Sequence, residues 1–377
     1  MENSKVVYLT GLNGLRAIAA ISVVIGHVTL YPFSTLNLPR IYLMFDGVTL
    51  FFVISGFLIT YLLLAEKEKT ATVKIDSFYV RRILRIWPIY YLVLAISAVF
   101  AVFVSHSNEF FTSSIFYYLF FCANIPLILN TGIISVVHYW SIGVEEQFYL
   151  FWPWVLKYSK NKLLMVSLIF IAVFFAVKTF AWYYAGENSV FYQVFSVTRF
   201  HCMLIGAVGA ILYYAGNKFF IKTTTHWLVQ FLAWLLVAVL YLNLKTVPEQ
   251  FLAEFTAIVS LVLIMGQVAK RTQGWNVINL ENNVFDFLGK ISYGIYVIHP
   301  LVIFGAYYVF ADLQLPMLPK SLLIYSVILF TTIVLSYISY QYFEKPFLKM
   351  KDKFTVVKSS NTKFVKAESD TVSNVEK

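Results

Sequence analysis

Charged residues are scarce in this chain: only 13% of its 377 residues are Asp, Glu, Lys or Arg, about half the share usual in soluble domains. Cysteine is scarcer still: the chain has two, Cys122 and Cys202. Their spacing suggests neither a disulfide framework nor a metal site. Hydrophobic residues make up 60% of the chain, and its mean hydropathy is +0.74. This composition excludes a soluble protein and indicates an all-α polytopic membrane protein.

Apolar runs of about 20 residues, long enough to cross a bilayer, recur along the chain. We predict about ten transmembrane helices, at 14–31, 47–65, 87–105, 137–157, 162–184, 198–215, 226–244, 251–269, 287–309 and 320–343. A further apolar stretch at 110–130 is interrupted by Asn124 and Pro126. It is predicted to be a re-entrant or interfacial piece, and the alternative is an eleventh span.

Lysine and arginine favour ten spans, because cytoplasmic loops hold the excess of these residues. With both termini in the cytoplasm, 23 of the 29 fall on the inner side, and an eleventh span would scramble this asymmetry. We predict a multi-pass protein of the cell (inner) membrane, with a cytoplasmic N-terminus (1–13), a transmembrane domain (14–347) and a disordered basic cytoplasmic tail (348–377). The net charge of +10 then favours anionic lipid headgroups, and no nucleic-acid partner is expected because the basic residues lie in separate loops.

The first apolar run, LNGLRAIAAISVVIGHV at 12–28, contains Arg16 and His27. In a helix, eleven residues bring the two side chains onto one face, about 16 Å apart along the axis. Arg16 is expected near the inner boundary, where snorkelling to headgroups is the alternative to a functional role. An ionisable residue as deep as His27 usually faces the bundle interior and marks function, and imidazole transfers protons near neutral pH. We predict His27 to be a general base.

The segment FYVRRILRIWPIYY, residues 78–91, places Arg81, Arg82 and Arg85 at spacings of three and four just before a span. Guanidinium groups on one side of a helical turn suit phosphate. Positive-inside anchoring predicts basic residues here too, but their density favours a phosphate site.

The segment HYWSIGVEEQFYLFWPW, residues 138–154, places Glu145 and Tyr149 on one helical stripe, with Trp140 and Ser141 as supporting residues. Glu145 is predicted to lie at the depth of His27 and to orient its imidazole; a structural hydrogen bond between helices is the alternative. Ser55, in FFVISGFLIT, is predicted to pack closely or to line a cavity together with Gly56.

A third polar stripe lies in LGKISYGIYVIHPLVIF, residues 288–304, where Ser292, Tyr296 and His299 share one helical face. Pro300 can free a backbone carbonyl toward the interior. We predict a supporting polar network, with catalysis as the alternative. His138 and His201 lie near span ends and are expected at interfaces.

These motifs, together with YFEKPF at 342–347, resemble the membrane acyltransferase family 3, which contains polysaccharide and lipopolysaccharide O-acetylases. The resemblance implies transfer of an acyl group, usually acetyl, from cytoplasmic acyl-coenzyme A to a hydroxyl of a cell-surface polysaccharide or glycolipid. It matches Arg16 and His27 to the family's first-span pair, and Arg81, Arg82 and Arg85 to its basic motif. Asn13 stands where aspartate is common, and the chain resembles the stand-alone form without a hydrolase-like domain after the last span.

We therefore expect acyl-coenzyme A as donor substrate, no permanently bound cofactor and no metal. Its phosphates would dock on the basic motif and Arg16, while His27 deprotonates the acceptor hydroxyl; a covalent acyl-histidine is a variant. One alternative is a proton-coupled glycolipid transporter or flippase that uses the His and Glu as a relay. Another is a non-catalytic sensor.

Overall fold

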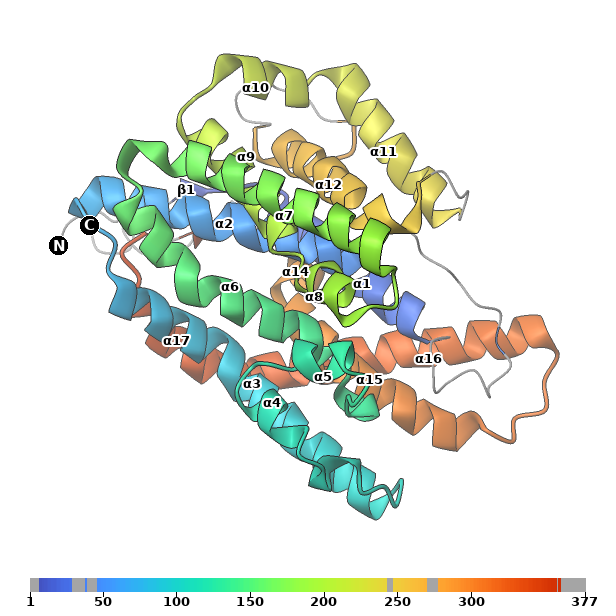
Figure 1. The fold of residues 1–377 in the computed structure, drawn as a ribbon. Helices are drawn as coiled ribbons and strands as arrows, with labels where there is room; N and C mark the ends of the chain where they lie inside the picture. Colours follow the sequence, from blue (N-terminus) through green and yellow to red (C-terminus); the bar gives the residue numbers. More distant parts are fainter. Residues whose placement is uncertain are drawn as a thin grey trace, which may run out of the picture.

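The computed structural model describes residues 7–28, 38, 46–242, 247–269, 277–357 and 359–360, and its architecture is a helical bundle (Figure 1). The longer helices are α1 (Leu12–His27), α2 (Gly47–Thr70), α3 (Ile75–Phe103), α6 (Tyr139–Tyr158), α7 (Leu163–Ala185), α9 (Phe200–Tyr214), α11 (Trp227–Tyr241), α12 (Leu252–Val268), α15 (Ser292–Phe310) and α16 (Met317–Ile338). Shorter helices are α4 (Ile115–Leu119), α5 (Asn124–Ile128), α8 (Val190–Thr198), α10 (Lys218–Thr224), α14 (Asn283–Lys290) and α17 (Lys345–Asp352). Single turns are η2 (Glu109–Phe111), η3 (Ile134–Val136), η4 (Lys160–Lys162) and η5 (Glu249–Phe251), and η6 (Ser339–Glu344) is π-helical.

Each of the ten predicted spans coincides with at least part of a helix, which confirms the all-α class. Within the described residues, seven helical stretches are long and apolar enough to cross a membrane, or eight if α10 and α11, bent by 51°, form one span. The 16 residues of α1 reach only about 24 Å, less than the bilayer core. Charged residues such as Glu145, Glu146 and Lys157 lower the hydropathy of α6. The membrane count therefore stands at seven or eight, and ten spans stay a prediction.

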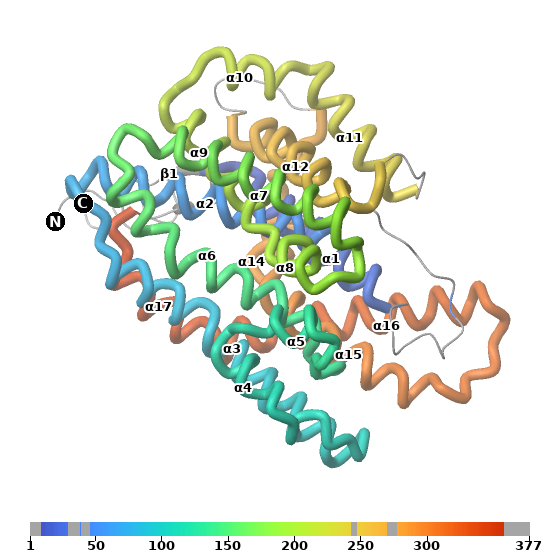
Figure 2. The backbone as a smooth tube through the Cα atoms, viewed as in Figure 1, coloured from blue at the N-terminus to red at the C-terminus, as the bar shows by residue number. Residues whose placement is uncertain are grey.

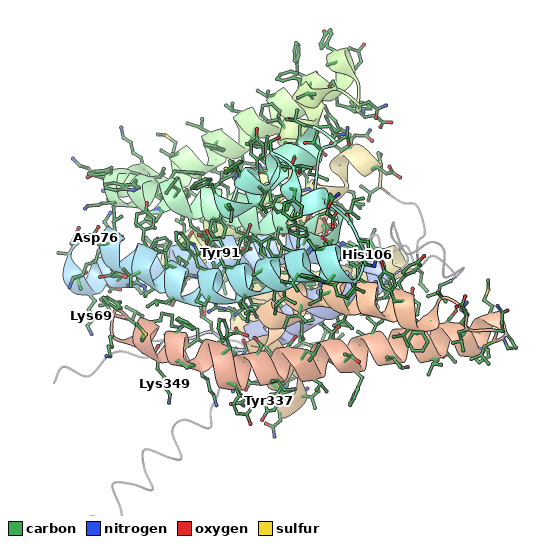
Figure 3. The ribbon with its side chains drawn as sticks, turned by 90° about the horizontal axis from the view of Figure 1, so that it is seen from below. Lys69, Asp76, Tyr91, His106, Tyr337 and Lys349 are labelled. Atoms are coloured by element: carbon green, nitrogen blue, oxygen red, sulfur yellow. The ribbon has the colours of Figure 1, made fainter. Side chains whose placement is uncertain are left out.

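The helices differ in how deeply they are buried. Most of α2 and α12 lies inside the bundle, whereas α7 and α16 are largely exposed at its periphery. α15 and α16 pack along each other and project at the end opposite to the strand β1 (Val7–Tyr8), as Figure 2 shows. Figure 3 shows that α3 crosses the bundle, from Asp76 beside Lys69 at one end toward His106 at the other.

The two ends of the described chain meet. β1 pairs in parallel with β2 (Ser359–Ser360), and Arg81 of α3 donates a hydrogen bond to the carbonyl of Phe354 just after α17 (2.8 Å). Both ends thus lie on the same side of the bundle, as the predicted topology requires. The predicted disordered tail begins at residue 348, but α17 is helical through Asp352, so the first residues of this tail are ordered. Residues 361–377 lie outside the described residues.

Stretch 110–130 holds only short helical pieces. α4 and α5 have five residues each, and the Tyr118 hydroxyl, buried between them and η3, accepts a hydrogen bond from the Ile133 amide (3.0 Å). Tyr90 of α3 donates to the Tyr118 carbonyl at 2.6 Å. The stretch is thereby tied to the bundle, and whether it enters the membrane stays a prediction.

Charges between α7, α9 and α12 are paired. The Lys178 ammonium lies 2.7 Å from a Glu254 carboxylate oxygen, and His201 Nε2 lies 2.8 Å from the same oxygen. Arg199, at the left-handed break between α8 and α9, pairs with Asp46, which caps α2 by accepting from the Val48 amide. His201 is fully buried inside the bundle, and its expected position at a membrane interface stays a prediction. These pairs satisfy ions that an apolar bundle would otherwise exclude.

α2 and α9 make the most extensive helix contact, and glycines allow it. A Cβ on Gly56 would lie against the Met203 carbonyl, and one on Gly206 would lie against that of Val53. Gly56 therefore serves close packing, one of the two roles predicted for it.

We expect Gly56→Val to destabilise the protein by about 1–3 kcal/mol or more, because the new side chain would force the α2 and α9 backbones apart. Thermal unfolding of the purified protein in detergent measures this change. Gly305→Ala in α15 is the matched control, because a Cβ there meets no atom within 4 Å. An unchanged midpoint for Gly56→Val would contradict the packing role.

Candidate active site

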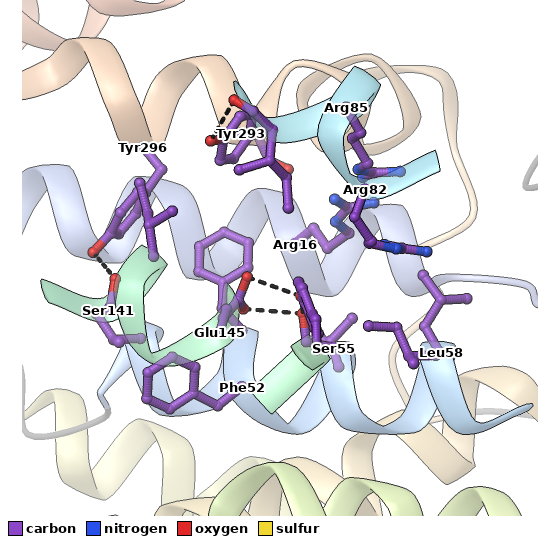
Figure 4. Close-up of a pocket in the computed structure, with 18 residues that line it drawn as sticks. Arg16, Phe52, Ser55, Leu58, Arg82, Arg85, Ser141, Glu145, Tyr293 and Tyr296 are labelled. Atoms are coloured by element: carbon purple, nitrogen blue, oxygen red, sulfur yellow. Dashed lines mark hydrogen bonds between the residues drawn. The ribbon is translucent and has the colours of Figure 1, made fainter. Parts of the chain in front are cut away.

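A pocket with about 730 Å³ of empty space, part of it open to the surroundings, lies among α1, α2, α3, α6 and α15 (Figure 4). Nine of the fourteen predicted site residues line it. The polar lining residues are Arg16, Ser55, Arg82, Arg85, Ser141, Glu145, Tyr149, Ser292, Tyr293 and Tyr296. The fold thus brings five separate sequence motifs to one cavity.

Three arginines converge on this pocket. Arg16 comes from α1, and Arg82 and Arg85 come from one turn of α3 (Figure 4). Arg82 lies over the rings of Phe78 and Tyr149, at 5.4 and 5.6 Å. None of the three guanidinium groups forms a hydrogen bond or ion pair with another described residue, and the buried Nε of Arg82 has no partner there. A half-buried cluster of cations without partners is suited to an anion of several charges.

Among the described residues, Glu145 is the one carboxylate that lines the pocket, and its partners differ from the prediction. It accepts hydrogen bonds from the Ser55 hydroxyl (2.9 Å) and the Tyr149 hydroxyl (3.0 Å), and it lies near Arg16. No contact with His27 appears among the described atoms, so the prediction that Glu145 orients His27 is wrong. The predicted alternative, a hydrogen bond between helices, is what α2 and α6 form here.

Arg81 does not line the pocket. Its guanidinium forms an ion pair with the buried Glu66 (2.8 Å) and donates to the Phe354 carbonyl. The same Glu66 accepts from the Lys74 amide (3.0 Å). Arg81 therefore ties α2, α3 and the end of α17 together, and its expected place beside Arg82 and Arg85 in a phosphate site is not what the structure shows.

Lys351 of α17 was missed by the sequence analysis, which assigned it to a disordered tail. It lies close enough to Arg85, Arg82 and Arg16 to interact with them electrostatically. Lys351 lies in KMKDK, a run that looks like any solvent-exposed basic segment, so no sequence signal shows that it lies near the arginines.

The His27 ring faces the protein interior. It lies edge to edge with the ring of His299 of α15, with ring centroids 5.0 Å apart and planes 12° from parallel, and His27 Nδ1 lies 2.9 Å from His299 Nε2. A third ring, His138, packs edge-on against His299 at 5.2 Å. His138 is only 3% exposed, so it packs inside the bundle; its expected position at a membrane interface stays a prediction. Three histidines from distant parts of the sequence thus form one cluster.

The histidine cluster adjoins the pocket through one hydrogen-bonded pair. Tyr296 and Ser141 both line the pocket, and their hydroxyls are 2.5 Å apart (Figure 4). Tyr296 also donates to the His138 carbonyl (3.0 Å), and its ring lies 5.8 Å from that of His299. Tyr296 is therefore the boundary between the arginines and the histidines.

The remaining supporting residues hold helices. Ser292 donates to the Gly289 carbonyl (2.9 Å) and lines the pocket. Trp140 lies outside the lining, under the Arg199 guanidinium at 5.5 Å. Asn13 donates from its side-chain amide to Asp286 of α14 (2.7 Å), also away from the pocket.

Comparison with known proteins identifies the class of this bundle. Residues 9–341 match the family model of the acyltransferase domain of acyltransferase family 3. The chain belongs to this family. The predicted resemblance is thereby confirmed.

Curated relatives are found in Staphylococcus aureus. A provisionally named O-acetyltransferase of strain COL is 28% identical over 369 residues, which cover 92% of this chain and 58% of the relative. The O-acetyltransferase OatA of strain NCTC 8325 is 28% identical over 367 residues, covering 91% and 57%. The chain thus spans less than two thirds of the length of these relatives. No solved structure matches the chain.

We expect Arg81→Met to lower the stability of the protein by about 3–5 kcal/mol, because it leaves the buried Glu66 carboxylate without its cation. The double variant Arg81→Met with Glu66→Gln should recover part of this loss. Thermal unfolding in detergent of the two single variants and the double variant measures the coupling. If the stability losses of the two single variants add up to that of the double variant, the Arg81–Glu66 ion pair contributes nothing to stability.

Proposed function

We propose that the protein is an integral membrane O-acyltransferase of the cell membrane, which moves an acyl group, acetyl in the simplest case, from cytoplasmic acyl-coenzyme A to a hydroxyl of a cell-surface polysaccharide or glycolipid. The observation that carries the proposal is the convergence of Arg16, Arg82 and Arg85 on one pocket of an acyltransferase-family bundle. The names of the relatives, which are O-acetyltransferases, support an acetyl group and an oxygen acceptor.

The donor binds by its phosphates. Coenzyme A carries a diphosphate and a further phosphate, and planar guanidinium forks bind such groups through paired hydrogen bonds. In the part of the chain that the structure describes, the lining holds one carboxylate, Glu145, and three arginines, so these side chains carry an excess of positive charge. The donor site uses Arg16, Arg82 and Arg85, whereas Arg81 is already engaged with Glu66.

The acyl end points toward the histidines. A donor whose phosphates lie on the arginines extends its thioester along the pocket to Ser141 and Tyr296, next to the cluster of His27, His138 and His299. α1 carries Arg16 and His27 about 16 Å apart on one face, so one helix spans the donor site and the transfer point.

The transfer is a nucleophilic acyl substitution assisted by His27. The imidazole takes the proton of the acceptor hydroxyl while the oxygen attacks the thioester carbon and forms the C–O bond. The C–S bond then breaks, and the leaving thiolate takes the proton from the imidazolium. The products are the ester and free coenzyme A, and no other reactant is needed.

A proton-coupled transporter is the second candidate from the sequence. Its key feature was a relay of His27 and Glu145, and the structure gives these two side chains separate partners, His299 and Ser55 with Tyr149. Family membership favours the acyltransferase over the transporter and the sensor.

We expect His27→Ala to reduce thiol release from acetyl-coenzyme A to the uncatalysed rate, because no other group replaces the base. The purified protein is assayed in detergent with chitotetraose as acceptor; hydrolysis, in which water replaces the sugar hydroxyl, also releases thiol. His106→Asn, at an exposed histidine outside the bundle core, is the control and should retain activity. A fully active His27→Ala would contradict the assignment, and a wild-type protein that releases no thiol would contradict the function.

We expect Arg85→Met to raise the KM for acetyl-coenzyme A by about 10–100-fold while kcat changes little, because a hydrogen bond to a charged group contributes about 1.5–3 kcal/mol. Lys349→Met, which removes an exposed cation on α17 at the same end of the bundle, is the control (Figure 3). Initial rates over a range of donor concentrations separate KM from kcat. If Arg85→Met and Lys349→Met have the same KM for acetyl-coenzyme A, the phosphates of the donor bind away from Arg85.

A further inference from the structure

The hydrogen bonds of His299 determine where its proton lies. Its Nδ1 is 2.7 Å from the carbonyl oxygen of Tyr296 and 3.2 Å from that of Ile295. Carbonyl oxygens only accept hydrogen bonds, so Nδ1 carries the proton. A neutral imidazole holds one proton, and His299 Nε2 is then a lone-pair acceptor.

Pro300 explains why the Tyr296 carbonyl is available. In a regular helix the amide of residue 300 would donate to the carbonyl of Tyr296, but proline has no N–H. The carbonyl freed in this way takes the His299 Nδ1 proton, at the shorter of the two distances. The dipeptide His299–Pro300 thus supplies both the ring and the acceptor that orients it.

His299 is neutral for electrostatic reasons. Its side chain is fully buried, and its described contacts are two histidine rings, a tyrosine ring and backbone carbonyls. A charge there without a carboxylate partner would cost several kcal/mol. Asp46 is the carboxylate that acts on His27, and it is already paired with Arg199.

We infer that His299 is a positioning residue that accepts the Nδ1 proton of His27 and thereby leaves the lone pair of His27 on Nε2, which makes Nε2 the atom that receives the acceptor hydroxyl proton. The 2.9 Å distance between His27 Nδ1 and His299 Nε2 carries this inference, because a lone pair on His299 requires a donor on His27. When Nε2 takes the proton, the same hydrogen bond stabilises the imidazolium until the thiolate leaves. The catalytic role rests on the proposed function, but the protonation pattern does not.

The first test uses the wild-type protein and needs no activity. Nitrogen NMR of protein labelled with ¹⁵N-histidine, in detergent micelles above pH 7, reports which ring nitrogen of each histidine is protonated, and His27→Gln assigns the His27 signals. We expect a protonated Nδ1 and an unprotonated Nε2 on His27, and the same pattern on His299. A proton on Nε2 of neutral His27 would overturn the inference.

The second test compares two substitutions of His299 in the thiol-release assay. His299→Leu keeps volume but removes the acceptor, and we expect kcat to fall about 5–100-fold with the KM for acetyl-coenzyme A within about twofold, since an unpaired buried donor costs about 1–3 kcal/mol. His299→Gln can place its carbonyl oxygen where Nε2 was and should recover most of this loss. If the role of His299 is purely structural, kcat of the two variants should follow their thermal stability. A kcat of His299→Gln no higher than that of His299→Leu, at equal stability, would overturn the inference. If the wild type itself releases no thiol, the proposed function fails, while the NMR result still decides the protonation pattern.

Discussion

A charge inside an apolar helical bundle must have a partner or serve a ligand, and this constraint separates six cations inside the described bundle into two sets. Arg81, Lys178 and Arg199 each form an ion pair with a carboxylate from another helix and hold elements together. Arg16, Arg82 and Arg85 form no such pair among the described residues and share one pocket. The first set explains how the bundle tolerates its ions, and the second is the basis on which we propose a polyanionic donor.

The arginines and the histidines of the site lie toward opposite ends of the same two helices, α1 and α15. α1 places Arg16 in the pocket and His27 in the histidine cluster, and α15 contributes Tyr296 to the boundary and His299 behind it. Because both helices extend from the arginines to the histidines, helix geometry rather than loops sets the distance between these two groups of side chains. A site on rigid elements keeps the geometry that proton transfer needs.

Patterns within one helix could be read from the sequence, whereas contacts between helices could not. The apolar windows located the main helices, and helical spacing placed Arg82 and Arg85 together and Tyr296 with His299 on one face. Spacing cannot say which helix faces which, so Glu145 was paired with His27 although Ser55 and Tyr149 are its partners. The contacts of His138 could not be read for a related reason: it precedes α6 by one residue, and its position near a span end does not show that its ring packs against Tyr296 and His299 of α15.

The asparagine at position 13 is explained by the same constraint on charge. The resemblance suggested aspartate there, and in this chain the Asn13 amide donates to Asp286, which also pairs with Lys290. A carboxylate at position 13 would face the Asp286 carboxylate at the same short distance, and two like charges in a mostly buried contact repel each other. The amide instead bonds α1 to α14 three residues before Arg16. Because Asn13 lies outside the pocket lining, its identity bears on the seating of α1 and not on the chemistry of transfer.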